Sequence, residues 1–566
     1  MKYRNLFIIL LTACLLCIDT TSGLSIHWLT APTLTAFLLS WPISFLPNRV
    51  RQTVQIILGE CFIVLCLVDC YCQVFLGTPI STQILNNILL SDSRETSEFL
   101  STFIGTDVIF NWRIILLLVL AVLLPISLFP KRQPPFACNG KKLRYAGILA
   151  LAFCGICEIP TTYRYIQLYS QKQNLESIEG LIFRHYHKEI PTPLHRIAFA
   201  LFASEQSVHV LDDIKRATFT ASVDSCSHLS PHIVLIIGES YNKHHASLYG
   251  YQLPTTPLQQ SRQEKGELHV FTDVVTPWNI TSNVFLDMFS LWEHDSRLTI
   301  NNYPLFPILF QRAGYSVTFF SNQYVKKGLH KGATNQAGHF FLADGEMSDS
   351  LFSFRNRKAS KFDLGLVGHV ASYLKDRKPG SYTLDIIHLI GQHFEYAARY
   401  PNSQATFSLS DYKERALNEE AKKVVMHYDN ATSYNDMVLD SLLSLYEQEE
   451  TIVLFVADHG EEAYDEQPIQ GRLFQTPTAT QAKYEFEVPM WIWCSGSYQA
   501  KHPEIVSSIR NSTGKPLLSD GLPQTLLFLA GIGCEWTNDS HNILSPHYQS
   551  KPRIIGGDTD YDRLMK

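Results

Sequence analysis

The chain has 566 residues, of which 46% are hydrophobic and 18% charged, and its formal net charge is -6. This length is enough for more than one domain with a sizeable core. The slightly acidic balance argues against a general nucleic-acid binder, which would carry a basic excess. Long uncharged apolar runs lie almost entirely before residue 160, and the rest has the composition of an ordinary soluble domain.

The apolar N-terminal part predicts five membrane-spanning helices, because a helix of about 20 apolar residues crosses a bilayer core. The predicted spans are residues 6–20, 24–46, 53–77, 112–130 and 143–160. With a cytoplasmic N-terminus, the loops rich in lysine and arginine, 48–51 and 131–144, both lie inside. This pattern follows the positive-inside rule and places everything after residue 160 outside the cytoplasm.

Two features of this part have alternative interpretations. The first span could be a cleaved signal peptide, which would still leave the C-terminal part outside. Residues 161–230 form a predicted connector, in which Leu194–Ser204 has the apolar face of an amphipathic helix. That helix could lie on the membrane surface or pack on the following domain.

Residues 231–566 predict an α/β domain. Short apolar runs rich in β-branched residues alternate with helical stretches, of which Tyr428–Leu445 is the clearest. The predicted strands are His232–Ile237, Ser316–Phe320, Leu384–Ile390, Thr451–Val456 and Val488–Trp493. Near-continuous apolar strands are buried on both faces, which predicts a largely parallel sheet flanked by helices.

Polar residues follow three of these strands. Glu239 follows the first, His393 the third, and the adjacent pair Asp458 and His459 the fourth. Ligands of open α/β sheets bind beyond the carboxyl ends of the strands. Glu239, Asp458 and His459 therefore predict a Zn²⁺ site with three protein ligands and one open position. The alternative is that Asp458 caps a helix and His459 is a packed core residue.

Five segments of the chain have the motifs of a known family in the same order and with similar spacing. They are Ser93–Leu100, Pro231–Pro257, Leu389–Pro401, Tyr428–Asp440 and Val456–Glu462. Together with the five apolar segments, they resemble the lipopolysaccharide phosphoethanolamine transferases. This family belongs to the alkaline phosphatase/sulfatase superfamily and includes enzymes that give polymyxin resistance. The resemblance implies a five-helix transmembrane bundle in the bacterial inner membrane and a periplasmic, alkaline-phosphatase-like catalytic domain.

The resemblance also implies a mechanism. The family's threonine nucleophile, which takes phosphoethanolamine from phosphatidylethanolamine and passes it to lipopolysaccharide, matches Thr281. Thr281 would also be a Zn²⁺ ligand, since metal coordination activates a hydroxyl. Ser240 and Ser282 are rival nucleophiles, but Ser240 directly follows Glu239, so we expect its side chain to point elsewhere.

Two further residues are implied as contacts of the phosphate. His393 matches a family histidine that contacts the phosphate or a second metal, and Lys327 aligns loosely with a lysine near the phosphate. A cation there would stabilise developing charge. The alternatives are a structural histidine and a solvated surface lysine.

The chain departs from the family in two ways. Many members have a histidine shortly after the Asp-His pair, but the stretch Glu466–Arg472 contains none, and Lys483 could take its place. The relatives' disulfides are missing, and at most one could form among Cys226, Cys494 and Cys534. The resemblance is therefore to a disulfide-poor branch, whose acceptor sugar need not be lipid A.

The main alternative function is a membrane phosphoglycerol transferase or phosphodiesterase of the same superfamily. A sulfatase activity is disfavoured because no cysteine begins a Cys-x-Pro-x-Arg segment. A catalytically inactive membrane scaffold is disfavoured because Glu239, Thr281, Asp458 and His459 are all present.

Overall fold

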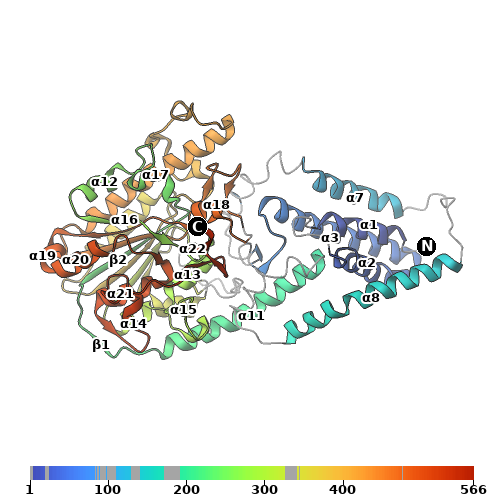
Figure 1. Ribbon diagram of the computed structural model, residues 1–566, viewed down its shortest axis with the longest axis horizontal. Coiled ribbons are helices and arrows are strands. Elements are labelled where there is room, and N and C mark those ends of the chain that lie inside the picture. Colours follow the sequence, from blue (N-terminus) through green and yellow to red (C-terminus); the bar gives the residue numbers. More distant parts are fainter. Residues whose placement is uncertain are drawn as a thin grey trace. The chain divides into compact units, whose positions relative to one another are not determined.

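The computed structural model describes residues 4–18, 25–82, 84–85, 88, 97, 110–128, 141–170, 192–324, 341–342, 344–473 and 476–566. The chain divides into two compact units (Figure 1). The first comprises residues 1–207 with 473–475, and the second comprises residues 208–472 with 476–566.

Each of the five predicted spans overlaps a helix, although the bounds differ. These helices are α1 (Arg4–Leu16), α2 (His27–Ser40), α3 (Asn48–Phe75), α7 (Trp112–Leu128) and α8 (Lys141–Ser170). Among the described residues, two segments are long and apolar enough to cross a membrane, Val50–Phe75 in α3 and Tyr145–Tyr163 in α8. The other helices are shorter, so the bundle of five spans stays a prediction.

The connector contains one long helix among its described residues. Helix α11 spans Pro193–Thr220 and includes the whole of the predicted amphipathic segment. Beyond that segment charged residues become more frequent, but Val210, Leu211 and Ile214 are still buried, so an apolar face continues into the second half of α11.

The second unit is built on a seven-stranded sheet in the order β3-β11-β8-β2-β7-β5-β6. All five predicted strands form, and two edge strands add to them. The bounds are β2 (His232–Gly238), β3 (Leu268–Phe271), β5 (Ser316–Ser321), β6 (Phe354–Arg355), β7 (Thr383–His388), β8 (Thr451–Ala457) and β11 (Met490–Cys494). Strand β11 runs antiparallel to both neighbours, whereas the other neighbouring strands pair in parallel. The sheet is therefore mixed, because an apolar run specifies burial but not strand direction.

Helices cover both faces of this sheet (Figure 1). Helices α12, α16 and α17 lie on one side, and α13, α14 and α21 lie on the other. The helices are α12 (Pro257–Glu264), α13 (Thr281–Phe289), α14 (Pro307–Arg312), α15 (Gly345–Leu351), α16 (Asp363–Lys375), α17 (Glu419–Tyr446), α18 (Ala479–Gln481), α19 (Gly496–Lys501), α20 (Pro503–Ser512), α21 (Leu522–Ala530) and α22 (Tyr561–Leu564). Two-residue strands complete the unit: β1 (Ser225–Cys226), β4 (Val274–Val275), β9 (Glu462–Ala463), β10 (Gln470–Gly471), β12 (Leu517–Leu518), β13 (Ile532–Gly533), β14 (Ile554–Ile555) and β15 (Thr559–Asp560).

Helix α17 begins well before the predicted start. Asn418 caps it by accepting a hydrogen bond from the backbone N–H of Ala421, and Glu419 and Glu420 occupy the first turn. A cap of this kind and acidic residues near the positive end of the helix dipole both stabilise a helix start. The apolar pattern missed these first turns because they are rich in charged residues.

The strand register brings the predicted site residues to one edge of the sheet. Gly238 at the end of β2 pairs with Ala457 at the end of β8. The next residues along the chain, Glu239 and Asp458, therefore leave the sheet side by side. On the other side of β2, His388 is the last residue of β7 and pairs with Ile237.

Candidate metal-dependent active site

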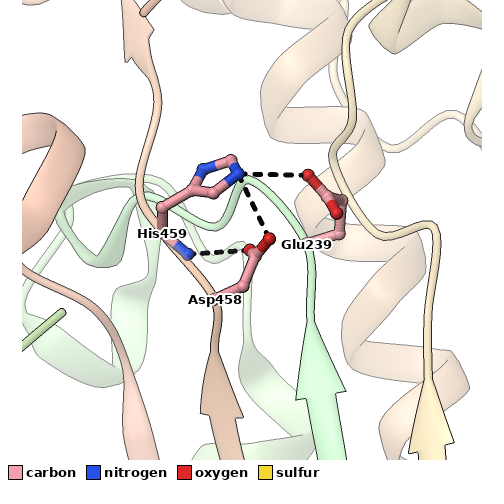
Figure 2. Close-up of side chains that lie close together, drawn as sticks. All are labelled: Glu239, Asp458 and His459. Carbon is pink, nitrogen blue, oxygen red and sulfur yellow. Dashed lines mark hydrogen bonds and ion pairs between the residues drawn. The ribbon is translucent and has the colours of Figure 1, made fainter. Parts of the chain in front are cut away.

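Three buried side chains converge where β2 and β8 end (Figure 2). The ligand atoms of Glu239, Asp458 and His459 all lie within 4.8 Å of one another, and we call these residues the metal-ligand cluster. The hydroxyl oxygen of Thr281 lies 3.3 Å from Glu239 Oε2 and 3.3 Å from His459 Nε2. The structure thus brings together the four residues predicted as Zn²⁺ ligands.

The hydrogen bonds of His459 define its tautomer. Its Nδ1 lies 2.9 Å from the carbonyl oxygen of Gly460, which can only accept, so Nδ1 carries the proton. Burial and the neighbouring Arg472 guanidinium lower the pKa of His459 to about 4, so the ring is neutral at physiological pH. Its Nε2 lone pair therefore faces the cluster and is available to a metal ion.

The donor set fits a metal ion. His459 Nε2 lies 3.1 Å from Asp458 Oδ2 and 3.3 Å from Glu239 Oε1, and all three atoms are acceptors. Asp458 Oδ2 is buried without a hydrogen-bond partner among the described residues. Burial and the Glu239 carboxylate raise the pKa of Asp458 well above its usual range. A bound cation would satisfy these converging lone pairs and keep both carboxylates ionised.

The Glu239 carboxylate is held by three neighbours. Ser240 Oγ donates to Oε1 at 2.9 Å, Gln323 Nε2 donates to Oε2 at 2.8 Å, and His388 Nε2 lies 3.6 Å from Oε2. The expectation that the Ser240 side chain points elsewhere was wrong. The backbone of Ser240 is left-handed (φ 54°), which directs its hydroxyl toward the Glu239 carboxylate. The importance of His388 was also missed, because β7 ends at this residue rather than at Ile390.

Close backbone approaches fix the loops around the cluster. A Cβ on Gly391, whose φ is +45°, would lie 2.7 Å from the carbonyl oxygen of Glu239. A Cβ on Gly460 would lie 2.1 Å from the carbonyl oxygen of Tyr484. Glycine is required at both positions, because any side chain would push these loops away from the metal-ligand cluster.

Thr281 is the first residue of α13, and its N-cap residue Ile280 makes no side-chain capping bond. The positive end of the helix dipole therefore acts on the Thr281 hydroxyl and would stabilise negative charge that develops there. The rival Ser282 donates to Asn283 Oδ1 at 3.4 Å. Of the two hydroxyls, only that of Thr281 has described hydrogen bonds with the metal-ligand cluster.

The predicted phosphate contacts are placed only in part. His393 is buried, and its charge would act on the carboxyl groups of Glu239 and Glu461. Lys327 lies outside the described residues. The structure does not bring Lys483 into the cluster, because its ammonium group pairs with Glu466 Oε1 at 2.7 Å.

Among the described residues, Arg472 is a cation that reaches the cluster. Its Nη1 lies 2.5 Å from His459 Nε2 and donates to the carbonyl oxygen of Asn279 at 2.8 Å. Its Nε lies 3.2 Å from Glu461 Oε2. Arg472 was not predicted from the sequence, because a histidine was the residue expected in that stretch. The useful signal would have been a cation of any kind shortly after the Asp-His pair.

The cysteines of the second unit agree with a disulfide-poor chain. Cys226, Cys494 and Cys534 are all free thiols. The framework around the cluster therefore rests on the sheet, on buried hydrogen bonds and on close packing rather than on cross-links between these residues.

Comparison with protein families matches residues 231–532 to the sulfatase family, and the chain belongs to that family. The match begins just before β2 and includes the whole metal-ligand cluster together with Thr281.

Several relatives are phosphoethanolamine transferases, as the sequence resemblance implied. EptC of Escherichia coli strain K12 is 25% identical over 540 residues, which cover 92% of this chain and 88% of that protein. CptA of Salmonella typhimurium is 25% identical over 536 residues, with the same coverage of 92% and 88%.

Solved structures agree with this assignment. The zinc complex of the C-terminal periplasmic domain of Escherichia coli EptC is 25% identical, with a TM-score of 0.52, and covers 61% of this chain and 96% of that one. The integral membrane protein EptA from Neisseria meningitidis covers 96% of this chain and 97% of its own, with a TM-score of 0.61. At 19% identity, this structural likeness shows a common fold and nothing more specific.

Proposed function

We propose that the protein transfers phosphoethanolamine from phosphatidylethanolamine to lipopolysaccharide, on lipid A or a core sugar. The observation that carries this proposal is the position of the Thr281 hydroxyl, 3.3 Å from both Glu239 Oε2 and His459 Nε2. A nucleophile placed within a metal-ligand set is suited to phosphoryl transfer. Phosphoethanolamine transferases that align with 92% of this chain support phosphoethanolamine as the transferred group.

Glu239, Thr281, Asp458 and His459 would hold one Zn²⁺ ion. When bound, the ion would lower the pKa of the hydroxyl and polarise the phosphoryl group. The zinc complex of the EptC periplasmic domain supports this choice of metal.

The reaction has two half-reactions. In the first, Thr281 Oγ1, whose proton has passed to solvent, forms a bond to phosphorus, the bond between phosphorus and the diacylglycerol oxygen breaks, and the leaving oxygen takes a proton. His393 would bind the phosphoryl group and supply that proton. In the second, an oxygen of a sugar hydroxyl or sugar phosphate forms a bond to the phosphorus of the phosphothreonine, the bond between phosphorus and Thr281 Oγ1 breaks, and the proton of the attacking group returns to His393. Lys327 would neutralise charge on the phosphate in both half-reactions.

A covalent intermediate suits two large amphiphilic substrates, because donor and acceptor can use one site in turn. Both substrates are membrane lipids, so the site must stay near a bilayer. In the proposed organisation residues 1–160 form the transmembrane domain, 161–230 the connector and 231–566 the periplasmic catalytic domain, anchored in the bacterial inner membrane. A reporter that is active only in the cytoplasm should therefore be silent when fused after Lys566, and strong reporter activity would contradict this topology.

The function is tested by mass spectrometry of lipopolysaccharide from cells that lack the protein, express it, or express Thr281→Ala. Only cells with the unaltered protein should show added phosphoethanolamine. Added phosphoglycerol would favour the alternative transferase. Lipopolysaccharide of identical mass in all three strains, with each protein present in the membrane, would contradict the proposal.

A further inference from the structure

Arg472 is a largely buried cation in direct contact with a residue of the metal-ligand cluster. It follows β10, which pairs with β9 as a short hairpin that returns the chain toward the cluster. Its side chain is 12% exposed, and the Glu461 carboxylate that pairs with its Nε is 1% exposed. A salt bridge buried to this extent is costly unless both partners are well satisfied, so Arg472 is unlike an ordinary surface arginine.

The hydrogen bond from Arg472 to His459 uses the atom that a metal ion would use. His459 Nε2 has one lone pair, and Nη1 of Arg472 approaches it to 2.5 Å. The same nitrogen lies 3.3 Å from Thr281 Oγ1. A bound metal ion would use the Nε2 lone pair of His459 and would repel the Arg472 guanidinium group. The hydrogen bond between Arg472 and His459 therefore cannot persist in the metal-bound protein.

The other contacts of Arg472 do not involve the metal ligands. Glu461 Oε2 and the Asn279 carbonyl oxygen can hold the guanidinium group beside the cluster after the bond to His459 is lost. Guanidinium has five N–H donors, and among the described residues Arg472 donates hydrogen bonds only from Nη1, while its Nε forms the ion pair with Glu461. Donors on both terminal nitrogens would then be available to a ligand next to Thr281.

The negative charge around Thr281 means that a transferring phosphate needs a nearby cation to bind it. Three buried carboxylates, Glu239, Asp458 and Glu461, lie close enough to act on the Arg472 guanidinium group, and Glu239 also lies beside the Thr281 hydroxyl that would carry the phosphoryl group. A transferring phosphate adds negative charge to this carboxylate-rich site, which a single divalent ion only partly offsets. The planar guanidinium group matches two phosphate oxygens at once and stabilises their charge.

We propose that Arg472 is a catalytic residue that binds the oxygens of the transferring phosphoryl group, with Glu461 as the residue that positions it. This inference rests on the proposed function and deepens that proposal by assigning Arg472 as a cation of the phosphate site. Arg472 donates hydrogen bonds throughout both half-reactions and neither gives up nor takes a proton, since arginine stays charged in proteins.

The test is binding of inorganic phosphate to the zinc-loaded, full-length protein, measured by calorimetry. Arg472→Met should retain zinc and bind phosphate about 10- to 100-fold more weakly, because charge-assisted hydrogen bonds are lost. Arg472→Lys, which keeps the charge but not the planar fork, should lie in between. Lys483→Met removes a nearby cation that pairs with Glu466 and should bind phosphate normally.

Unchanged phosphate affinity in Arg472→Met would overturn the proposal, and so would loss of zinc in both Arg472 variants, since Arg472 would then act on the metal site itself. Phosphate binding requires neither donor lipid nor acceptor. A weakened phosphate affinity would therefore stand even if lipopolysaccharide proved not to be the acceptor, and the two proposals can fail separately.

Discussion

Replacement of Gln323 by leucine tests how the Glu239 carboxylate is prepared for metal binding. Gln323 Nε2 donates to Glu239 Oε2 at 2.8 Å and to the Leu389 carbonyl oxygen at 3.2 Å. It thereby holds one carboxylate oxygen, while Oε1 faces His459 Nε2 at 3.3 Å. Leucine has a similar size and cannot donate, so Oε2 would lose this hydrogen bond and the carboxylate would be less firmly oriented by its remaining partners.

Loss of such a partner of a metal ligand typically weakens metal binding by about 10- to 100-fold. For Gln323→Leu this corresponds to about 1.4–2.7 kcal/mol, at about 1.4 kcal/mol for each factor of ten. The assay is competition for Zn²⁺ between the full-length protein and a chelator of known affinity. The matched control is Gln499→Leu, which removes an amide that donates to the Cys494 carbonyl oxygen away from the cluster. Equal zinc affinity in Gln323→Leu, Gln499→Leu and the unaltered protein would refute the reasoning.

Two further predictions concern Asp458 and His245. Asp458→Ala should lose zinc, because it removes a buried oxygen that has no hydrogen-bond partner in the described part of the chain, and elemental analysis that found full zinc content would show that the site lies elsewhere. Burial alone would lower the pKa of His245, but Asp465 and Asp429 raise it from 6.5 to about 10. Charged His245 therefore contributes stability that is fully present below pH 6.5 and is lost as pH rises toward 10. Unfolding midpoints should fall over that range, His245→Gln should flatten the fall, and an equally steep fall in the variant would contradict the assignment.

The strands and the metal-ligand cluster could be predicted from the sequence because local signals encode them. Continuous apolar runs specified the buried strands β2, β5, β7 and β8, and the polar residues directly after β2 and β8 specified Glu239, Asp458 and His459. Strand direction depends on how the chain returns, so the antiparallel β11 could not be predicted. The edge strands β3 and β6 are short and lack a strong pattern of their own.

The residues around the cluster were harder to predict because they reach it through tertiary structure. Gln323 arrives from the loop after β5, and Arg472 arrives from the β9–β10 hairpin. The Ser240 side chain turns back to Glu239 because of a left-handed backbone conformation, which a serine in a sequence does not reveal. Thr281 was found through family resemblance alone, since nothing in its neighbouring residues marks it as a nucleophile.

The most direct test of the account is intact-mass analysis of the zinc-loaded protein after exposure to phosphatidylethanolamine without acceptor. The proposed mechanism predicts a single phosphoethanolamine adduct that peptide mapping places on Thr281. The adduct should be absent from Thr281→Ala, which should retain its fold, and should still form in Ser240→Ala, whose hydroxyl only donates to Glu239. An adduct on Ser240 or Ser282, or transfer by Thr281→Ala at the rate of the unaltered protein, would contradict the account.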